Sequence, residues 1–324
     1  MKISVVIPSF NRAGFVGRTI ESVLTQTRLP DEILVVDDGS SDNTQSVVAE
    51  FSRIGARVRY LWRENGGLSA ARNTGVANAA PDTDALLFLD SDDLLEPTAL
   101  AKLDLALAAS PDAVLAFCRA RYINADDAPL IVPNTALCDE PEGGDMWNHL
   151  LHGNCVRSAG GVLIRRAALD AERFDETLRS NEDWDLWLRL AETGKPFVRV
   201  PEPLLLYRIH GGNMSANRAV MHQTALHVYE KTETRHIGNA DKLARIHAGR
   251  AEYERRDTFT QNEAVQYVLQ TEDAIDLPYD AAAVRKHQRL RALLTKTGIA
   301  ALHRKTPLAW RLRLRALLGI NPNA

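Results

Sequence analysis

Short apolar segments alternate with helical segments along residues 1–118. The apolar segments are rich in Val, Ile and Leu, as strands buried on both faces are, and they lie at Ile3–Ile7, Glu32–Val36, Val58–Trp62, Ala85–Leu89 and Ala113–Phe117. Helical segments separate them, near 13–26, 41–53, 68–79 and 97–109. This alternation predicts β-α-β units with right-handed crossovers, and hence an α/β fold with a mostly parallel sheet flanked by helices.

The pattern loosens after residue 118. Prolines and a Gly-Gly pair indicate loops as far as residue 215, and the short elements that stand out are Gly161–Arg165, Trp184–Glu192 and Phe197–Val200. From residue 216 onward strand signals vanish and successive helices are predicted. We therefore expect a first domain over 1–215 and an α-helical C-terminal region over 216–324.

Composition adds a charge asymmetry to this picture. The chain has 324 residues, 45% of them hydrophobic and 25% charged, as in ordinary globular proteins. Residues 281–324 hold ten Lys or Arg and no acidic residue, so a body of net charge −13 carries a basic tail of +10. Three cysteines without C-x-x-C spacing, and the lack of a signal peptide or long apolar run, predict a reduced, cytoplasmic protein.

Polar residues follow three of the predicted strands, at 8–12, 37–42 and 90–93. In a parallel sheet these segments share the edge where ligands bind. The acids at 90, 92 and 93 repel one another unless a cation lies between them, and carboxylate oxygens suit Mg²⁺ or Mn²⁺. An alternative is structural: both acidic segments also fit turns, with Asp93 or a neighbour capping the next helix.

Six segments, in order and spacing, resemble the family-2 inverting glycosyltransferases of the GT-A fold. They are VVIPSFNRAGFVGRTIESVLTQT, EILVVDDGSSDNT, NGGLSAARNTGVANA, LLFLDSDD, NEDWDLWLRL and YRIHGGNMS, within about residues 2–215. The resemblance implies a Rossmann-like GT-A domain that takes a nucleotide-diphosphate sugar as donor. It further implies transfer to an acceptor hydroxyl with inversion of configuration, and a role in synthesis of a cell-surface polysaccharide or glycolipid.

The resemblance also assigns roles to residues. Pro8, Phe10 and Asn11 would line the base and ribose pocket, with Phe10 as the stacking surface, and Asp38 would accept hydrogen bonds from the base. Further roles fall to Arg72 in the same pocket, to Asp90 at the ribose or a bridging water, and to Asp92, Asp93 and His210 at a Mn²⁺ or Mg²⁺ ion that bridges the phosphates. A lone histidine is more often a surface or hydrogen-bonded residue.

The predicted general base is Asp183, the second acid of the Glu-Asp pair in NEDWDLWLRL. It would take the proton of the acceptor hydroxyl as that oxygen attacks the anomeric carbon in line with the leaving diphosphate. The alternative is simple helix capping by Asn181 or Asp183. Loops at 119–160 and 205–216 are expected to close over the donor and exclude water.

Other functions fit the sequence less well. A dinucleotide-binding oxidoreductase would have a G-x-G-x-x-G motif after the first strand, and this sequence has none there; it has no P-loop motif either. A catalytically inactive module that binds nucleotide sugars or glycans stays an alternative, which turnover assays would decide. The basic tail at 281–324 is either a solvated surface or an interfacial anchor at an anionic membrane. With an anchor, the enzyme would lie on the inner face of the plasma membrane, beside a glycan or lipid-linked acceptor; no nucleic acid is expected.

Overall fold

A computed structural model describes residues 1–53, 57–130, 145–156 and 158–257 of the chain. The chain divides into two compact units, Met1–Glu272 and Asp273–Ala324. The second unit lies wholly outside the described residues, and the basic tail with it. Within the described ranges, no helix is long and apolar enough to cross a membrane.

The first half of the sheet is the parallel β-α-β arrangement that the sequence predicts. The strands β1 (Ile3–Ser9), β2 (Glu32–Asp37), β3 (Val58–Trp62) and β4 (Ala85–Phe88) lie in the order β3-β2-β1-β4 and pair in parallel. Helices connect them: α1 (Val16–Leu24), α2 (Thr44–Arg53) and α3 (Leu68–Asn78). Every residue of β1, β2 and β4 is buried, because helices cover both faces of a parallel sheet.

The second half of the sheet is mixed, which corrects the prediction of a mostly parallel sheet. The strand β8 (Val162–Arg165) lies antiparallel between β4 and β6 (Leu115–Ile123), and β9 (Phe197–Arg208) runs parallel to β6. The short strands β5 (Leu94–Leu95) and β7 (Pro129–Leu130) pair antiparallel with β9 and β6. The described pairings are thus half parallel and half antiparallel. The sequence did not predict this, because apolar periodicity indicates a strand but not the strand that it pairs with.

Strand β9 is longer than the sequence pattern indicates. Pro201 and Pro203 suggest a break, but they lie where the register between β6 and β9 shifts, from Cys118 opposite Val200 to Arg119 opposite Pro203. A β-bulge accommodates proline because it removes the need for a ladder hydrogen bond there. The loops predicted over 119–160 and 205–216 therefore begin too early in the chain, since residues 119–123 belong to β6 and residues 205–208 to β9.

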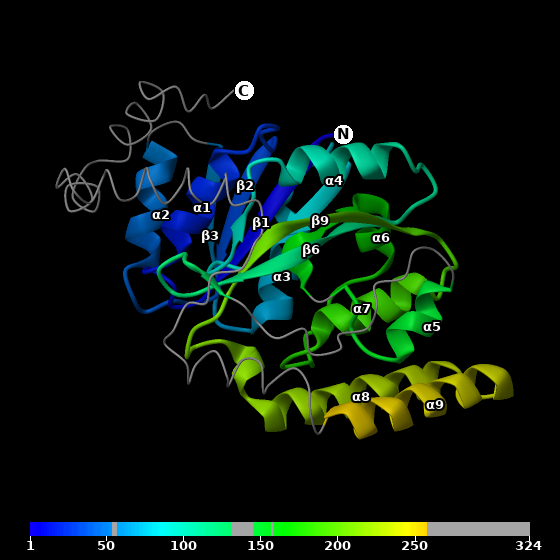
Figure 1. The fold of residues 1–324 in the computed structure, drawn as a ribbon. Coiled ribbons are helices and arrows are strands. Elements are labelled where there is room, and N and C mark those ends of the chain that lie inside the picture. Colours follow the sequence, from blue (N-terminus) through cyan, green and yellow to red (C-terminus); the bar gives the residue numbers. More distant parts are fainter. Residues whose placement is uncertain (54–56, 131–144, 157, 258–324) are drawn as a thin grey trace. The chain divides into compact units, whose positions relative to one another are not determined.

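Helices complete the fold around and beyond the sheet (Figure 1). They are α4 (Ala99–Ala108), α5 (Met146–Leu151), α6 (Arg166–Ala171), α7 (Glu182–Ala191), α8 (Arg218–Arg235) and α9 (Ala240–Asp257), with 3-10 turns η1 (Ala159–Gly161) and η2 (Met214–Ala216). The core continues from the sheet into these helices through Trp184, Trp187 and Tyr229, all fully buried. Helices α8 and α9 lie side by side.

Candidate active site

The segments after β1 and β2 are joined to each other at the carboxyl edge of the sheet. Asn11 Oδ1 accepts from the Ser41 amide at 2.8 Å, and the Asn11 amide donates to Ser40 Oγ at 2.8 Å. Asn11 adopts a left-handed conformation, with φ of 52°, which asparagine tolerates better than most residues. Pro8 is buried in β1, whereas Phe10 is 46% exposed and presents its ring to solvent. Phe10 is therefore free to stack on a planar ligand.

Asp38 is held by the loop that precedes α3. Its carboxylate accepts from the amides of Gly66 at 3.1 Å and Gly67 at 2.7 Å, and it forms an ion pair with Arg63 at 2.6 Å. Gly67 has φ of 92°, a conformation that suits glycine and orients its amide toward the carboxylate. Asp38 therefore lies at the carboxyl edge of the parallel strands, as predicted. A nucleotide base that binds Asp38 would share its carboxylate with these donors.

Arg72 does not join Asp38 but links two acids elsewhere in the site. It is buried on α3, with Nη1 2.5 Å from Glu182 Oε1 and Nη2 2.8 Å from Asp90 Oδ1. Its guanidinium also lies over the ring of Phe174, 5.1 Å from the centroid. A planar fork of donors can hold two carboxylates in fixed positions. Arg72 thus fixes the acid after β4 relative to the start of α7.

The acidic segment after β4 separates its three carboxylates. Asp92 Oδ2 lies 3.0 Å from His210 Nε2 and 3.2 Å from Arg12 Nε. Burial raises the pKa of Asp92, but the hydrogen bond from His210 and the charge of Arg12 outweigh burial and hold it below its usual value. Asp92 is thus an ionised group that already contacts the pair formed by Arg12 and His210.

Asp93 points away from this pair, toward β9. Its Oδ1 accepts from the Arg208 amide at 2.8 Å, and its Oδ2 is buried with no hydrogen-bond partner among the described residues. Burial, with repulsion from Asp92 and Asp90, raises the pKa of Asp93 well above its usual value. Asp93 does not cap α4, whose N-cap residue is Thr98. The structure therefore brings Asp92 and His210 together and leaves Asp93 apart from them.

His210 is fixed by an aromatic contact and by its own loop. Its ring stacks on Phe15 at 4.9 Å between centroids and 18° between planes. Its Nδ1 accepts from the Gly212 amide at 3.0 Å, so Nε2 carries the proton that faces Asp92. Across the described residues, no three His, Cys, Asp or Glu side chains are grouped so that they could hold a metal ion by themselves.

Asp183 lies in the first turn of α7. Its Oδ1 accepts from the Trp184 amide at 2.7 Å, and Oδ2 from Asn154 Nδ2 at 3.3 Å. Burial and the neighbouring Glu182 raise the pKa of Asp183 to about 7, although Arg72 opposes them. Asn181 occupies the N-cap position of α7, as the capping alternative has it, but its side chain accepts no hydrogen bond from the helix.

Several residues of this site received no role from the sequence. Glu182 pairs with Arg72, Arg12 pairs with Asp92, and Asn154 contacts Asp183. Arg208 is fully buried, and its Nε donates to the Asp92 carbonyl at 2.5 Å. Glu182, Arg12 and Arg208 all lie inside the six matching segments, which is the signal that marks them. Asn154 lies outside every such segment, so only the fold reveals it.

Comparisons with known proteins place this geometry in a family. The family model described as glycosyl transferase family 2 matches residues 4–171, more than half of the chain. An uncharacterized glycosyltransferase of Rickettsia typhi is 26% identical over 249 residues, which cover 75% of this chain and 73% of the relative. Another, alr2836 of Nostoc sp., is 31% identical over 237 residues, which cover 69% of this chain and 70% of the relative.

Solved structures share the fold at lower identity. Residues 1–349 of TarS from S. aureus, in complex with UDP-GlcNAc, match with a TM-score of 0.62 and 20% identity, over 84% of this chain and 76% of that one. The mannosyltransferase PcManGT from Pyrobaculum calidifontis, in complex with GDP-Man and Mn²⁺, matches with a TM-score of 0.55 and 18% identity, over 91% and 83%. The chain belongs to glycosyl transferase family 2 and has the GT-A fold.

Proposed function

We propose that this chain transfers a sugar from a nucleotide-diphosphate sugar to an acceptor hydroxyl, with inversion, and that Asp183 is the general base. The observation that carries the proposal is the state of Asp183, a carboxyl group with a pKa of about 7 at the start of α7. A base whose pKa lies near the working pH transfers protons most effectively. The GT-A neighbours in complex with UDP-GlcNAc and GDP-Man support a donor of this class.

The donor would bind at the carboxyl edge of the parallel strands. Phe10 offers an exposed ring for stacking on the base, and Pro8 and Asn11 would line the pocket beside it. Asp38 would accept from the base edge while Gly66 and Gly67 hold its carboxylate in place. Asp90, fixed by Arg72, would face the ribose or a bridging water.

A divalent cation fits the donor set of Asp92 and His210. Mn²⁺ and Mg²⁺ are commonly held by one or two carboxylates together with substrate phosphates, and the imidazole of His210 would be a further ligand. To bind the cation through Nε2, His210 would have to carry its ring proton on Nδ1. The Gly212 amide, which now donates to Nδ1, would then have to leave it. Asp93 is the less suited member of the predicted set, since it contacts β9. When bound, the cation neutralises charge on the leaving diphosphate.

The residues of the chain would divide the chemistry between two sides of the sugar. Asp183 takes the proton of the acceptor hydroxyl, so that the oxygen can attack the anomeric carbon from the face opposite the diphosphate. Arg72 holds Glu182 beside Asp183 and Asp90 beside the donor, which fixes base and donor relative to each other. Arg12 and His210 offer positive charge and a hydrogen-bond donor where the diphosphate leaves.

The test combines donor binding with turnover in one matched pair of proteins. UDP-GlcNAc and GDP-Man are supplied with Mn²⁺ to the intact chain and to Asp183→Asn. Thermal stabilisation by the donor reports binding, and release of nucleoside diphosphate reports turnover. We expect the variant to keep the stabilisation and to lose turnover by roughly 10²- to 10⁴-fold. Stabilisation of the intact chain by donors that it never turns over would instead indicate an inactive binding module.

The acceptor and the location of the enzyme belong to the same proposal. We place the chain in cell-surface polysaccharide or glycolipid synthesis, with a glycan or lipid-linked acceptor. The ten basic residues within 281–324 would hold the enzyme at an anionic membrane surface on the cytoplasmic side. This would bring the site close to an acceptor that is itself anchored in the membrane.

A further inference from the structure

The residue before the Glu182–Asp183 pair has an unusual backbone conformation. Asn181 lies in the left-handed region, with φ of 56° and ψ of 18°, and α7 begins directly after it. Residues other than glycine adopt this region infrequently, so neighbouring contacts must favour it. If Asn181 relaxed to the right-handed conformation, it would extend α7 backward and turn the following carboxylates away from their present positions.

The contacts that hold Asn181 come from α8. Its Nδ2 donates to Thr224 Oγ1 at 2.8 Å and to the Met221 carbonyl at 3.0 Å. Thr224 Oγ1 is free to accept because its own proton goes to the Val220 carbonyl at 2.8 Å. Ser180 Oγ also hydrogen-bonds Thr224 Oγ1. The second turn of α8 therefore forms hydrogen bonds with both residues that directly precede α7.

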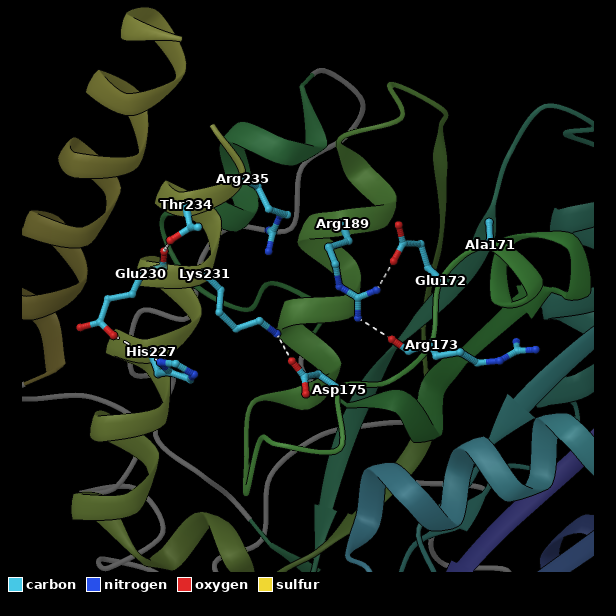
Figure 2. A pocket seen from close by; sticks show the side chains of 10 residues that line it. All are labelled: Ala171, Glu172, Arg173, Asp175, Arg189, His227, Glu230, Lys231, Thr234 and Arg235. Atoms are coloured by element: carbon cyan, nitrogen blue, oxygen red, sulfur yellow. Dashed lines mark hydrogen bonds and ion pairs between the residues drawn. The ribbon is translucent and has the colours of Figure 1, made fainter. Parts of the chain in front are cut away.

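A second group of contacts fixes α7 further along the same face. Asp185 is fully buried, with Oδ1 2.9 Å from Lys231 Nζ and Oδ2 2.9 Å from Arg189 Nε. Figure 2 shows Lys231 and Arg235 on α8 and Arg189 on α7 beside the pocket that these helices line. Trp184 packs edge-on against Tyr229 of α8 at 5.3 Å. These contacts hold the first turn of α7, which contains Asp185, against α8, and Asn181 sets the backbone conformation from which that turn begins.

We infer that Thr224 and Asn181 form a positioning pair that aims Asp183 at the acceptor hydroxyl. The inference rests on the proposed function, because it assigns the pair a task in the reaction of Asp183. Both residues lie beyond residues 4–171, the part matched by the family model. The helical region after the sheet thus supplies part of the catalytic apparatus as well as stability.

The experiment compares hydroxyl-deleting and hydroxyl-keeping variants of α8 in the intact chain. Thr224→Val removes the acceptor for Asn181 with little change in shape, and Thr224→Ser keeps it. Thr234→Val is the matched control, since its hydroxyl donates to the Glu230 carbonyl at 2.8 Å in the same way but makes no hydrogen bond with α7 among the described residues. The measured quantities are kcat, the donor KM and the pH profile of kcat.

We expect Thr224→Val to lower kcat by about 10- to 100-fold with the donor KM within about twofold, because misdirecting a base by a fraction of an ångström weakens transfer far more than binding. The acid limb of its kcat profile should also shift relative to that of the intact chain. Thr224→Ser should restore kcat, and Thr234→Val should leave kcat and the pH profile unchanged.

Variants of Asn181 separate the contact from the backbone conformation. Glycine adopts a positive φ without strain, whereas alanine does not, and neither carries the amide. Asn181→Gly should therefore keep more turnover than Asn181→Ala. The inference is overturned if Thr224→Val and Asn181→Ala retain the kcat of the intact chain, or if Thr234→Val lowers kcat as much as Thr224→Val. If Thr224→Val fails to fold, the Asn181 pair decides alone.

These results are distinguishable from failure of the proposed function. Turnover that is abolished in Asp183→Asn and normal in Thr224→Val leaves the general base in place and removes only the positioning pair. Turnover that persists in Asp183→Asn, or a chain that never turns over a donor, removes the proposed function itself.

Discussion

At the scale of single residues, the protonation of Asp183 should set the pH dependence of turnover. Burial and Glu182 raise its pKa to about 7. Below that pH the carboxyl group is neutral and cannot accept a proton, so kcat should fall about tenfold for each pH unit below the pKa and level off above it. The measurement is kcat against pH at saturating donor and acceptor. A limb that follows the ordinary carboxyl pKa, near about 4, would contradict it.

The same pKa has a consequence for stability that serves as a control. The folded-state value lies above the unfolded one, so ionisation of Asp183 disfavours the folded state and stability falls as pH rises from about 4 to about 7. Asp183→Asn removes this term. It should therefore melt at a higher temperature than the intact chain at about pH 8, and the difference should shrink toward about pH 4.

Sequence motifs locate these residues better than they assign their partners. Asp92 and His210 lie far apart in the chain but meet in the structure, as the matching segments imply. Arg72 was expected in the same pocket as Asp38, and the structure shows that its ion pairs are with Asp90 and Glu182. A motif records which residue occupies a position, whereas the direction of a long side chain depends on which charges the fold buries around it.

At the scale of elements, local patterns determine strands and helices well and their neighbours poorly. The five predicted strands before residue 118 all exist, with ends within a few residues of those expected for four of them, while the last continues to Ile123. The insertion of β8 between β4 and β6 was not predictable. Its position depends on long-range packing, to which a four-residue apolar segment gives no guide.

The attachment of α9 to α5 depends on close approach of two backbones at Gly249. A Cβ atom at this position would lie 2.3 Å from the Leu151 carbonyl oxygen, so the helices would have to move apart. Gly249→Ala should lower the free energy of unfolding by about 1–3 kcal/mol, as overpacking does, despite the better helix propensity of alanine. Urea denaturation provides the measurement.

Gly14→Ala is the control for this change, because, its chain neighbours apart, no atom of the described residues lies within 4 Å of its Cβ position. It should alter the free energy of unfolding by less than about 0.5 kcal/mol. If Gly249→Ala were as stable as the intact chain, the close approach of α9 to Leu151 would be wrong.

At the scale of the whole molecule, charge separates along the chain. The part before residue 281 has a net charge of −13, and it contains the acids of the site, such as Asp90, Asp92 and Asp183. Segment 281–324 has a net charge of +10 and lies outside the described residues. Sequence counting alone therefore supports the membrane prediction, and an experiment on the intact chain is the way to decide it.

We expect the intact chain to sediment with vesicles that contain anionic lipid at low salt and to stay in the supernatant with purely zwitterionic vesicles. Each basic residue near such a surface contributes about 1 kcal/mol, and at about 0.1 M salt charges interact over roughly 10 Å. Binding should therefore weaken steeply as salt rises. Replacing Arg311, Arg313 and Arg315 by Gln should weaken it at constant salt, whereas replacing Lys102, on α4 and paired with Glu202, should not. Equal sedimentation of the triple variant and the intact chain would show that the tail is not the anchor.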